Sequence, residues 1–127
     1  MEANKIIITG AATRIGAAIA KSLSGPDVEI VIHYNSSKTK AEKLKRELIK
    51  NHTKVFLIKG DLSKEKDLNK IIKFSKKKLK YFDCLINNAS LFENDNLRNF
   101  TSKSWDKHLD VNLKAPAYLT KEFAKNT

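Results

Sequence analysis

The stretch Thr9-Gly10-Ala11-Ala12-Thr13-Arg14-Ile15-Gly16 joins an apolar run to a segment with helical periodicity. Ile6-Ile7-Ile8 comes before it, and apolar residues recur at helical spacing as far as Leu23 after it. This layout is typical of a turn that binds a dinucleotide. Gly10 lets the backbone turn tightly after a strand. Gly16 lets the next helix approach the sheet and brings its N-terminal N–H groups near a pyrophosphate, an anion that the helix dipole favours.

Composition limits the class of protein. A length of 127 residues suits one domain, and 41% hydrophobic residues can bury a modest core. No apolar run approaches the roughly 18 residues of a membrane span, and the four residues before the first strand leave no room for a signal peptide. We therefore expect no membrane partner and a cytoplasmic location.

The formal charge of +11 comes from 25 Lys and Arg against 14 Asp and Glu, and most of the basic residues are lysines on helical stretches. A nucleic-acid-binding domain would usually combine such charge with interleaved arginines and aromatic residues or with a recognition helix, and neither is present in the sequence. A solvated lysine surface that attracts phosphorylated ligands is the preferred interpretation. A basic nucleic-acid-binding domain remains the less favoured alternative.

The segments between turn residues alternate between strand and helix patterns. Gly25-Pro26 ends the first helix, Gly60-Asp61 ends the third strand, and Ser63 is expected to cap the helix that follows. The predicted strands are Ile6–Ile8, Val28–Tyr34, Val55–Ile58 and Asp83–Asn87, and the predicted helices are Ile15–Leu23, Lys38–Asn51, Ser63–Leu79 and a last one from near Ser102 to Lys125.

Strict alternation predicts an α/β fold with a parallel sheet covered on both faces. Right-handed crossovers with a reversal after the third strand place the strands in the order 3-2-1-4, a Rossmann-type doubly wound sheet. A ligand would then lie across the carboxyl ends of strands 1 and 4. We expect residues 1–127 to form a single nucleotide-binding domain.

Four motifs at these strand ends and on the last helix together resemble the short-chain dehydrogenase/reductase family. They are Thr9-Gly10 with Gly16, Gly60-Asp61-Leu62, Asn87-Asn88-Ala89-Ser90 and Asp110-Val111-Asn112. The resemblance covers essentially the whole chain. It implies that the first motif, with Ile15, holds a coenzyme pyrophosphate and that Asp61 and Leu62 contact the adenine. It also implies that Asn88 and Ala89 line the coenzyme and that Asn112 supports a catalytic proton relay.

Further details resemble the pteridine reductases and the dihydromonapterin or dihydrofolate reductases of the short-chain type. Arg14 replaces the middle glycine of the usual pattern, His33-Tyr34-Asn35-Ser36-Ser37 follows the second strand, and Ser90 ends the fourth-strand motif. The resemblance implies that Arg14, His33, Tyr34 and Ser37 surround the adenosine phosphate of NADPH. It assigns Ser90 to coenzyme and substrate and Phe92 to stacking on a pterin. One departure is Ser36, which stands where the subgroup has arginine, so Arg14 or Lys38 would supply the charge.

The residues also bear on coenzyme choice. A carboxylate after the second strand would accept hydrogen bonds from the ribose hydroxyls of NADH and repel a 2′-phosphate, but residues 34–40 contain no acidic residue. Opposite charges about 4 Å apart are worth about 1 kcal/mol in water and about 4 kcal/mol near a protein surface. The sequence therefore favours NADPH by roughly tenfold to a thousandfold.

Each candidate residue also has a structural interpretation. His33 and Tyr34 could simply end a strand, and Phe92 could anchor a loop. Asn112 shares a helical face with apolar residues, so it is either a functional amide or a core amide with satisfied hydrogen bonds. Cys84 lies in an apolar stretch and is predicted to be a buried core thiol. His52 and His108 have no metal-ligand spacing, so we expect both on the surface and no metal site.

The family resemblance also implies a serine and a Tyr-x-x-x-Lys motif, whose tyrosine protonates the substrate while NADPH delivers hydride. The letters fit only at Tyr34–Lys38, which lies in the nucleotide half and cannot place a proton donor in the active site. We therefore interpret the chain as the N-terminal half of an NADPH-dependent reductase, inactive alone, with a small-molecule pterin or related substrate and a homo-oligomeric full-length form. A short protein that binds a dinucleotide without turnover is the alternative.

Overall fold

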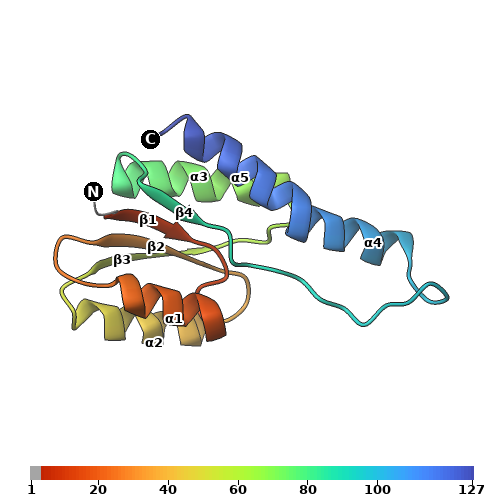
Figure 1. Ribbon diagram of the computed structural model, residues 1–127, viewed down its shortest axis with the longest axis horizontal. Helices are drawn as coiled ribbons and strands as arrows, with labels where there is room; N and C mark the ends of the chain where they lie inside the picture. Colours follow the sequence, from red (N-terminus) through yellow and green to blue (C-terminus); the bar gives the residue numbers. More distant parts are fainter. Residues whose placement is uncertain (1–3) are drawn as a thin grey trace.

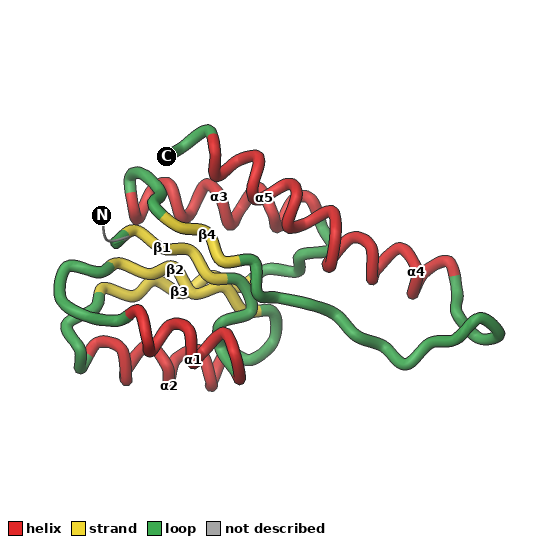
Figure 2. The backbone as a smooth tube through the Cα atoms, in the orientation of Figure 1, coloured by secondary structure: helices red, strands yellow, loops and turns green. Residues whose placement is uncertain are grey.

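The computed structural model describes residues 4–127, in which strands and helices alternate up to β4 (Figure 1, Figure 2). The elements are β1 (Lys5–Ile8), α1 (Arg14–Leu23), β2 (Glu29–Tyr34), α2 (Lys38–Ile49), β3 (Lys54–Lys59), α3 (Glu65–Leu79), β4 (Cys84–Ile86), α4 (Ser102–Leu109), the π-helical turn η1 (Asp110–Lys114) and α5 (Ala115–Ala124).

The strands form one parallel sheet in the order β3-β2-β1-β4, which confirms the predicted 3-2-1-4 order and the Rossmann-type fold. Ile7 of β1 pairs in register with Val31 on one side and Leu85 on the other. Figure 1 shows α1 and α2 on one face of the sheet and α3 and α5 on the other. The crossover from β3 to β4 reverses the strand order beside β1, and ligands of such sheets bind at that reversal.

Burial on both faces explains why the central strands are continuously apolar. Ile6 and Ile8 pack with Leu48 in the core beneath α1 and α2, whereas Ile7 packs with Phe82 on the opposite face. All three isoleucines are no more than 1% exposed. Because neighbouring side chains of a strand alternate between faces, one short run supplies both cores.

The start of α3 differs from the prediction. Lys64, not Ser63, occupies the N-cap position, and the helix begins at Glu65. Asp61 accounts for the shift, because its Oδ1 accepts hydrogen bonds from the Ser63 backbone N–H at 2.9 Å and from the Ser63 hydroxyl at 2.7 Å. The serine thus belongs to an Asx turn that ends the β3 loop, and it does not cap the helix.

The predicted last helix is divided into three parts, because η1 separates α4 from α5. Figure 2 shows α4 and the loop before it extending away from the sheet, and several large apolar side chains there are exposed. These include Phe92, Leu97 and Trp105, at 85%, 93% and 56% exposure respectively, and Leu113 on η1 is 65% exposed. None of the helices within residues 4–127 is long and apolar enough to cross a membrane.

Candidate functional site

The carboxyl ends of β1 and β4 are joined by Thr9 and Asn88. Thr9 Oγ1 accepts hydrogen bonds from the backbone N–H groups of Asn88 at 3.1 Å and Ala89 at 3.0 Å. The Asn88 side-chain amide in turn donates to the carbonyls of Thr9 at 3.2 Å and Gly10 at 3.0 Å. Two segments almost eighty residues apart therefore form one rigid turn at the point where the strand order reverses.

Both glycines of this turn are required by its geometry. Gly10 has φ +61°, in the left-handed region, and a Cβ there would lie 2.8 Å from Ala89 Cα. A Cβ on Gly16 would lie 2.5 Å from the Gly10 carbonyl oxygen and 2.6 Å from the Asn88 amide nitrogen. The close approach of α1 to the turn is possible only because Gly16 has no side chain.

The N-terminus of α1 is left open toward solvent. Thr13 at the N-cap makes no side-chain cap hydrogen bond, the first turn holds no acidic residue, and the first helical bond runs from Ala17 N–H to the Thr13 carbonyl. The backbone N–H groups before Ala17 therefore have no helical acceptor, and the helix dipole adds partial positive charge there. Such an end can hold an anionic group.

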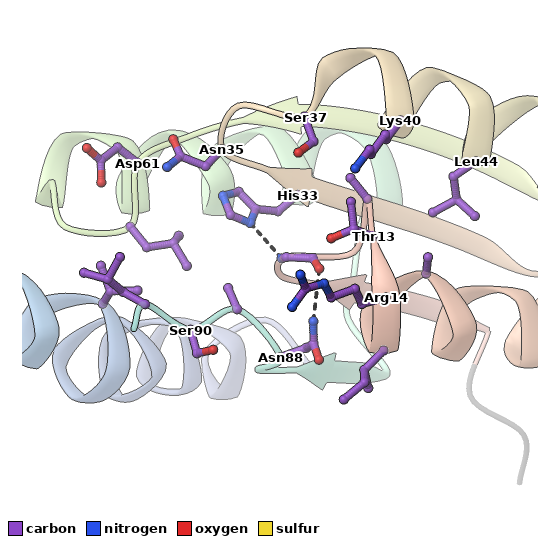
Figure 3. A pocket seen from close by; sticks show the side chains of 18 of the residues that line it. Thr13, Arg14, His33, Asn35, Ser37, Lys40, Leu44, Asp61, Asn88 and Ser90 are labelled. Atoms are coloured by element: carbon purple, nitrogen blue, oxygen red, sulfur yellow. Dashed lines mark hydrogen bonds between the residues drawn. The ribbon is translucent and has the colours of Figure 1, made fainter. Parts of the chain in front are cut away.

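A pocket of about 950 Å³ lies beside this helix end (Figure 3). Most of the predicted site residues line it together, although they come from the ends of all four strands. Those residues are Gly10, Arg14, Ile15, His33, Ser37, Asp61, Leu62, Asn88, Ala89 and Ser90. The structure thus gathers the three strand-end motifs around one cavity, as the parallel topology requires.

Four predicted site residues lie outside the pocket lining. Gly16 supports the turn from behind, and Tyr34 is 9% exposed and packs with Ala12 and Ala41. Phe92 lies on the exposed loop. The Asn112 amide accepts a hydrogen bond from the Leu91 N–H at 2.7 Å and donates to the Leu91 carbonyl at 2.8 Å. Asn112 itself is exposed, so it is not the core amide of the structural interpretation, although its amide has both hydrogen-bond partners.

Two basic residues on α2, Lys40 and Lys43, line the pocket and were missed by the sequence analysis. Lys38, which we considered as a charge donor, does not line it. The missed signal is helical spacing: Lys40 lies three residues before Lys43 and four before the buried Leu44, which places them on the side of α2 that meets α1. Arg14, from the start of α1, lies in the same cavity (Figure 3).

Two acidic side chains at the pocket are held ionised. Hydrogen bonds from Ser63 lower the pKa of Asp61 below its ordinary value. The pKa of Glu47 is lowered by the hydrogen bond from Lys21, whose Nζ lies 3.1 Å from the carboxylate. Because Lys21 neutralises Glu47, the net charge that α1 and α2 present to the pocket is positive.

The other titratable candidates are placed as follows. Cys84 is half-buried rather than buried; it packs against the core, and burial raises the pKa of its thiol, which disfavours a nucleophilic thiolate. His52 is exposed, as expected. His108 is half-buried and bonded through both ring nitrogens, so it joins α4 to the loop at Glu93. Within residues 4–127 there is no group of three or more His, Cys, Asp or Glu that could hold a metal ion.

Comparison with curated proteins finds relatives of about twice this length. A short-chain dehydrogenase/reductase, FrzI, from Cladobotryum sp. is 31% identical over 113 residues, which are 89% of this chain and 44% of FrzI. A 3-oxoacyl-[acyl-carrier-protein] reductase from Synechocystis sp. is 26% identical over 98% of this chain and 51% of its own length. The chain therefore spans about half the length of the curated relatives that it matches.

Solved structures show the same fold. The structure of FolM alternative dihydrofolate reductase 1 from Brucella canis complexed with NADP superposes with a TM-score of 0.86 at 29% identity, over 95% of this chain and 49% of that one. A short chain dehydrogenase from Burkholderia cenocepacia, in complex with NADP, gives a TM-score of 0.91 at 24% identity, over 97% of this chain and 50% of that one.

A family profile described as short chain dehydrogenase matches residues 4–127, which is almost the whole chain and includes every strand-end motif described above. The chain belongs to the short-chain dehydrogenase family.

Proposed function

We propose that this chain is the coenzyme-binding half of a reductase that uses NADPH. The observation that carries the coenzyme choice is the charge after β2. No acidic side chain occurs from Tyr34 to Lys40, while Arg14, Lys40 and Lys43 line the adjoining pocket. A 2′-phosphate would meet these three cationic side chains, and the Glu47 carboxylate that also lines this side of the pocket is paired with Lys21. A ribose 2′-hydroxyl would find no carboxylate acceptor directly after β2.

Each part of the pocket suits one part of the coenzyme. The open N-terminus of α1 would take the pyrophosphate, since its free N–H groups and dipole favour an anion. The ends of β2 and β3 would take the adenosine, with Ser37 and Asp61 as polar partners. Ala89 and Ser90, after β4, would lie toward the nicotinamide. When bound, the coenzyme supplies hydride; the chain's own residues bind and orient it.

The substrate that we propose is a pterin or a related carbonyl or imine compound. The support is the sequence pattern around Arg14, His33 and Ser90, together with the similarity to an alternative dihydrofolate reductase. Phe92 is 85% exposed on the loop beyond Ser90, so its ring is free to stack on a flat heterocycle. Asn112 would act as a positioning residue, because it fixes Leu91 at the pocket wall.

We further propose that the proton donor lies in a part of the reductase beyond these residues. The only tyrosine with lysine four positions later is Tyr34, and its side chain is buried among Ala12 and Ala41. The chain also spans about half the length of its relatives. An open reading frame after Thr127 that encodes Tyr-x-x-x-Lys would support the reductase. A natural stop codon with retained coenzyme binding would support a dinucleotide-binding protein without turnover.

We also propose that the functional form is a homo-oligomer. Trp105, Leu109 and Leu113 expose large apolar side chains on α4 and η1, and β4 is an edge strand of the sheet described here. Exposed apolar surface and an unpaired edge both favour association. We expect the 127-residue chain to elute as an oligomer or to aggregate, and to reduce no dihydropterin. A monodisperse monomer in light scattering would contradict the association.

The coenzyme site is tested by matched lysine variants on α2. Lys40→Ala removes a cation that lines the pocket, whereas Lys38→Ala removes one from the same helix outside it. We expect Lys40→Ala to reduce the thermal stabilisation by NADPH and to leave that by NADH unchanged, because only NADPH carries the 2′-phosphate. Lys38→Ala should resemble wild type with both coenzymes. Equal effects of the two variants would contradict the assignment.

A further inference from the structure

One buried imidazole connects two turns of the nucleotide pocket. His33, the fifth residue of β2, is 2% exposed. Its Nδ1 accepts a hydrogen bond from the Gly10 backbone N–H at 3.0 Å (Figure 3), and its Nε2 lies 2.8 Å from the Gly60 carbonyl oxygen. The ring thus contacts the turn after β1 on one side and the turn after β3 on the other.

The partners of the two nitrogens define the state of the ring. A backbone N–H can only donate, so Nδ1 must carry a lone pair; a carbonyl can only accept, so Nε2 must carry the proton. Both bonds are made at once only by the neutral ring protonated at Nε2. A doubly protonated ring would face the Gly10 N–H with a second donor, and the bond to the turn would be lost.

Backbone bonds extend this link on both sides. The His33 carbonyl accepts from Ala11 N–H at 3.0 Å, so the residue holds the first turn through its ring and through its backbone. On the other side, the peptide unit between Gly60 and Asp61 donates its N–H to Asp67 Oδ2 at 2.7 Å while its carbonyl meets the His33 ring. The Gly60–Asp61 peptide is therefore fixed at both of its polar atoms.

We infer that His33 is a positioning residue: its neutral imidazole fixes the spacing between the Gly10 turn and the Gly60-Asp61 turn, and this spacing sets the coenzyme affinity. The inference rests on the proposed function, because it assumes that the coenzyme spans both turns. It assigns His33 a role that differs from direct contact with the adenosine phosphate, since both ring nitrogens are already bonded to the protein.

The surroundings keep the ring neutral. Burial lowers the pKa of His33 most, and the positive charge of Lys70 on α3 lowers it further. The bond to Gly60 and the negative charge of Asp67, also on α3, act in the opposite direction without reversing the shift. Asp61 follows in the β3 turn, while the β1 turn faces the ring with the uncharged Gly10. Near neutral pH the bridge is intact, and it opens when acid protonates the ring.

Two substitutions separate the bridge from general packing. His33→Asn retains an acceptor near the position of Nδ1, cannot be protonated and is too short to donate to the Gly60 carbonyl, whereas His33→Leu fills a similar volume with no polar atom. NADP⁺ is the probe, with its dissociation constant measured by calorimetry between about pH 5 and 8. Urea unfolding of each variant identifies conditions in which it is fully folded. The phosphate of NADP⁺ titrates in the same way whether the coenzyme binds wild type or His33→Asn. His33→Asn is therefore the control for the titration of the coenzyme itself.

At neutral pH we expect His33→Leu to weaken NADP⁺ binding by at least about tenfold while folded, because the Gly10 N–H loses its acceptor. His33→Asn keeps the acceptor for Gly10 but loses the donor to Gly60, so its affinity should lie between those of wild type and His33→Leu. Wild type should lose affinity relative to His33→Asn only below the pH at which the ring takes up its proton, and burial holds that pKa below its ordinary value. A folded His33→Leu or His33→Asn variant with wild-type affinity would overturn the inference.

Nitrogen NMR of the three histidine rings tests the bridge without coenzyme. His33 should be the Nε2–H tautomer, and His108 the opposite one, because its Nε2 accepts from the Glu93 N–H while its Nδ1 meets the Ser104 carbonyl. A Nδ1–H tautomer at His33 would overturn the inference directly. If wild type bound neither NADP⁺ nor NAD⁺, the proposed function would fail and the coenzyme role of His33 with it, whereas the tautomer would still report whether the bridge exists.

Discussion

Substitution of Gly16 by alanine tests the turn on which the whole site depends. The added Cβ would lie 2.5 Å from the Gly10 carbonyl oxygen, 2.6 Å from the Asn88 amide nitrogen and 2.7 Å from Ala11 Cα. Two of these atoms belong to the backbone of a rigid turn, so α1 must move away from the sheet or the turn must open. Overpacking of this kind costs about 1–3 kcal/mol.

Two smaller effects accompany the clash. Displacement of the Asn88 amide would weaken its bond to the Gly10 carbonyl, a loss of about 1 kcal/mol. Alanine has a higher helix propensity than glycine, which offsets at most about 1 kcal/mol of this destabilisation. The offset is smaller here because Gly16 lies in the first turn of α1. We therefore expect a net destabilisation of about 2–3 kcal/mol, a large part of the roughly 5–15 kcal/mol that a domain usually has.

Urea unfolding followed by circular dichroism measures this effect directly. Gly25→Ala is the matched control, because a Cβ on Gly25 meets no atom within 4 Å and its φ is not in the left-handed region. Gly25→Ala should unfold within about 0.5 kcal/mol of wild type. If Gly16→Ala were as stable as Gly25→Ala, the close packing of α1 against the turn would be wrong.

Three further predictions concern single side chains. Arg14→Ala should remove most of the preference for NADPH over NADH in thermal-shift assays, because it deletes a cation of the pocket; an unchanged preference would exclude Arg14 from the phosphate site. In a reductase with measurable turnover, Phe92→Ala should raise the KM for pterin much more than the KM for NADPH. Unchanged pterin kinetics would show that Phe92 only anchors the loop and does not stack on the substrate. Ser63→Ala should raise the pKa of Asp61 toward its ordinary value, which carbon NMR of the carboxyl measures. A lowered folded-state pKa stabilises the fold above the ordinary pKa, and this stabilisation is lost as the pH falls through the folded-state pKa. Wild type should therefore be more stable than Ser63→Ala at neutral pH, with a difference that shrinks in acid, and a constant difference would contradict this.

The elements that could be predicted from the sequence are those set by local pattern. Ile6-Ile7-Ile8 is buried on both faces, so it reads as a strand with no knowledge of its neighbours. Gly10 has a positive φ and Gly16 an approach too close for any side chain, so residue identity alone marks the turn. The strand order followed from the crossover rule, and with it the gathering of the strand-end motifs around one pocket.

The differences arise where a tertiary contact competes with a local rule. Ser63 has the chemistry of an N-cap, but the Asp61 carboxylate two residues earlier takes both of its donors. Tyr34 ends its strand pointing into the core beside Ala41, a choice that depends on where α2 packs. The π-helical turn at Asn112 shifts the helix register, so the sequence could not show which side chains of the last helix are exposed.

Tertiary packing also explains why Lys40, and not Lys38, lines the pocket. Both lysines lie in the first turn of α2, and only the packing of that helix against α1 decides which one reaches the cavity. The sequence predicted a cationic side chain at the phosphate end of the pocket, but it did not identify which lysine of α2 supplies it.

The most direct test of the central claim, that this pocket is built for NADPH, is titration calorimetry of the chain with NADPH and with NADH at one pH and one salt concentration. The charge at the end of β2 predicts that NADPH binds at least about tenfold more tightly, with a preference that shrinks as salt screens the lysines. Equal affinities, or tighter binding of NADH, would contradict it.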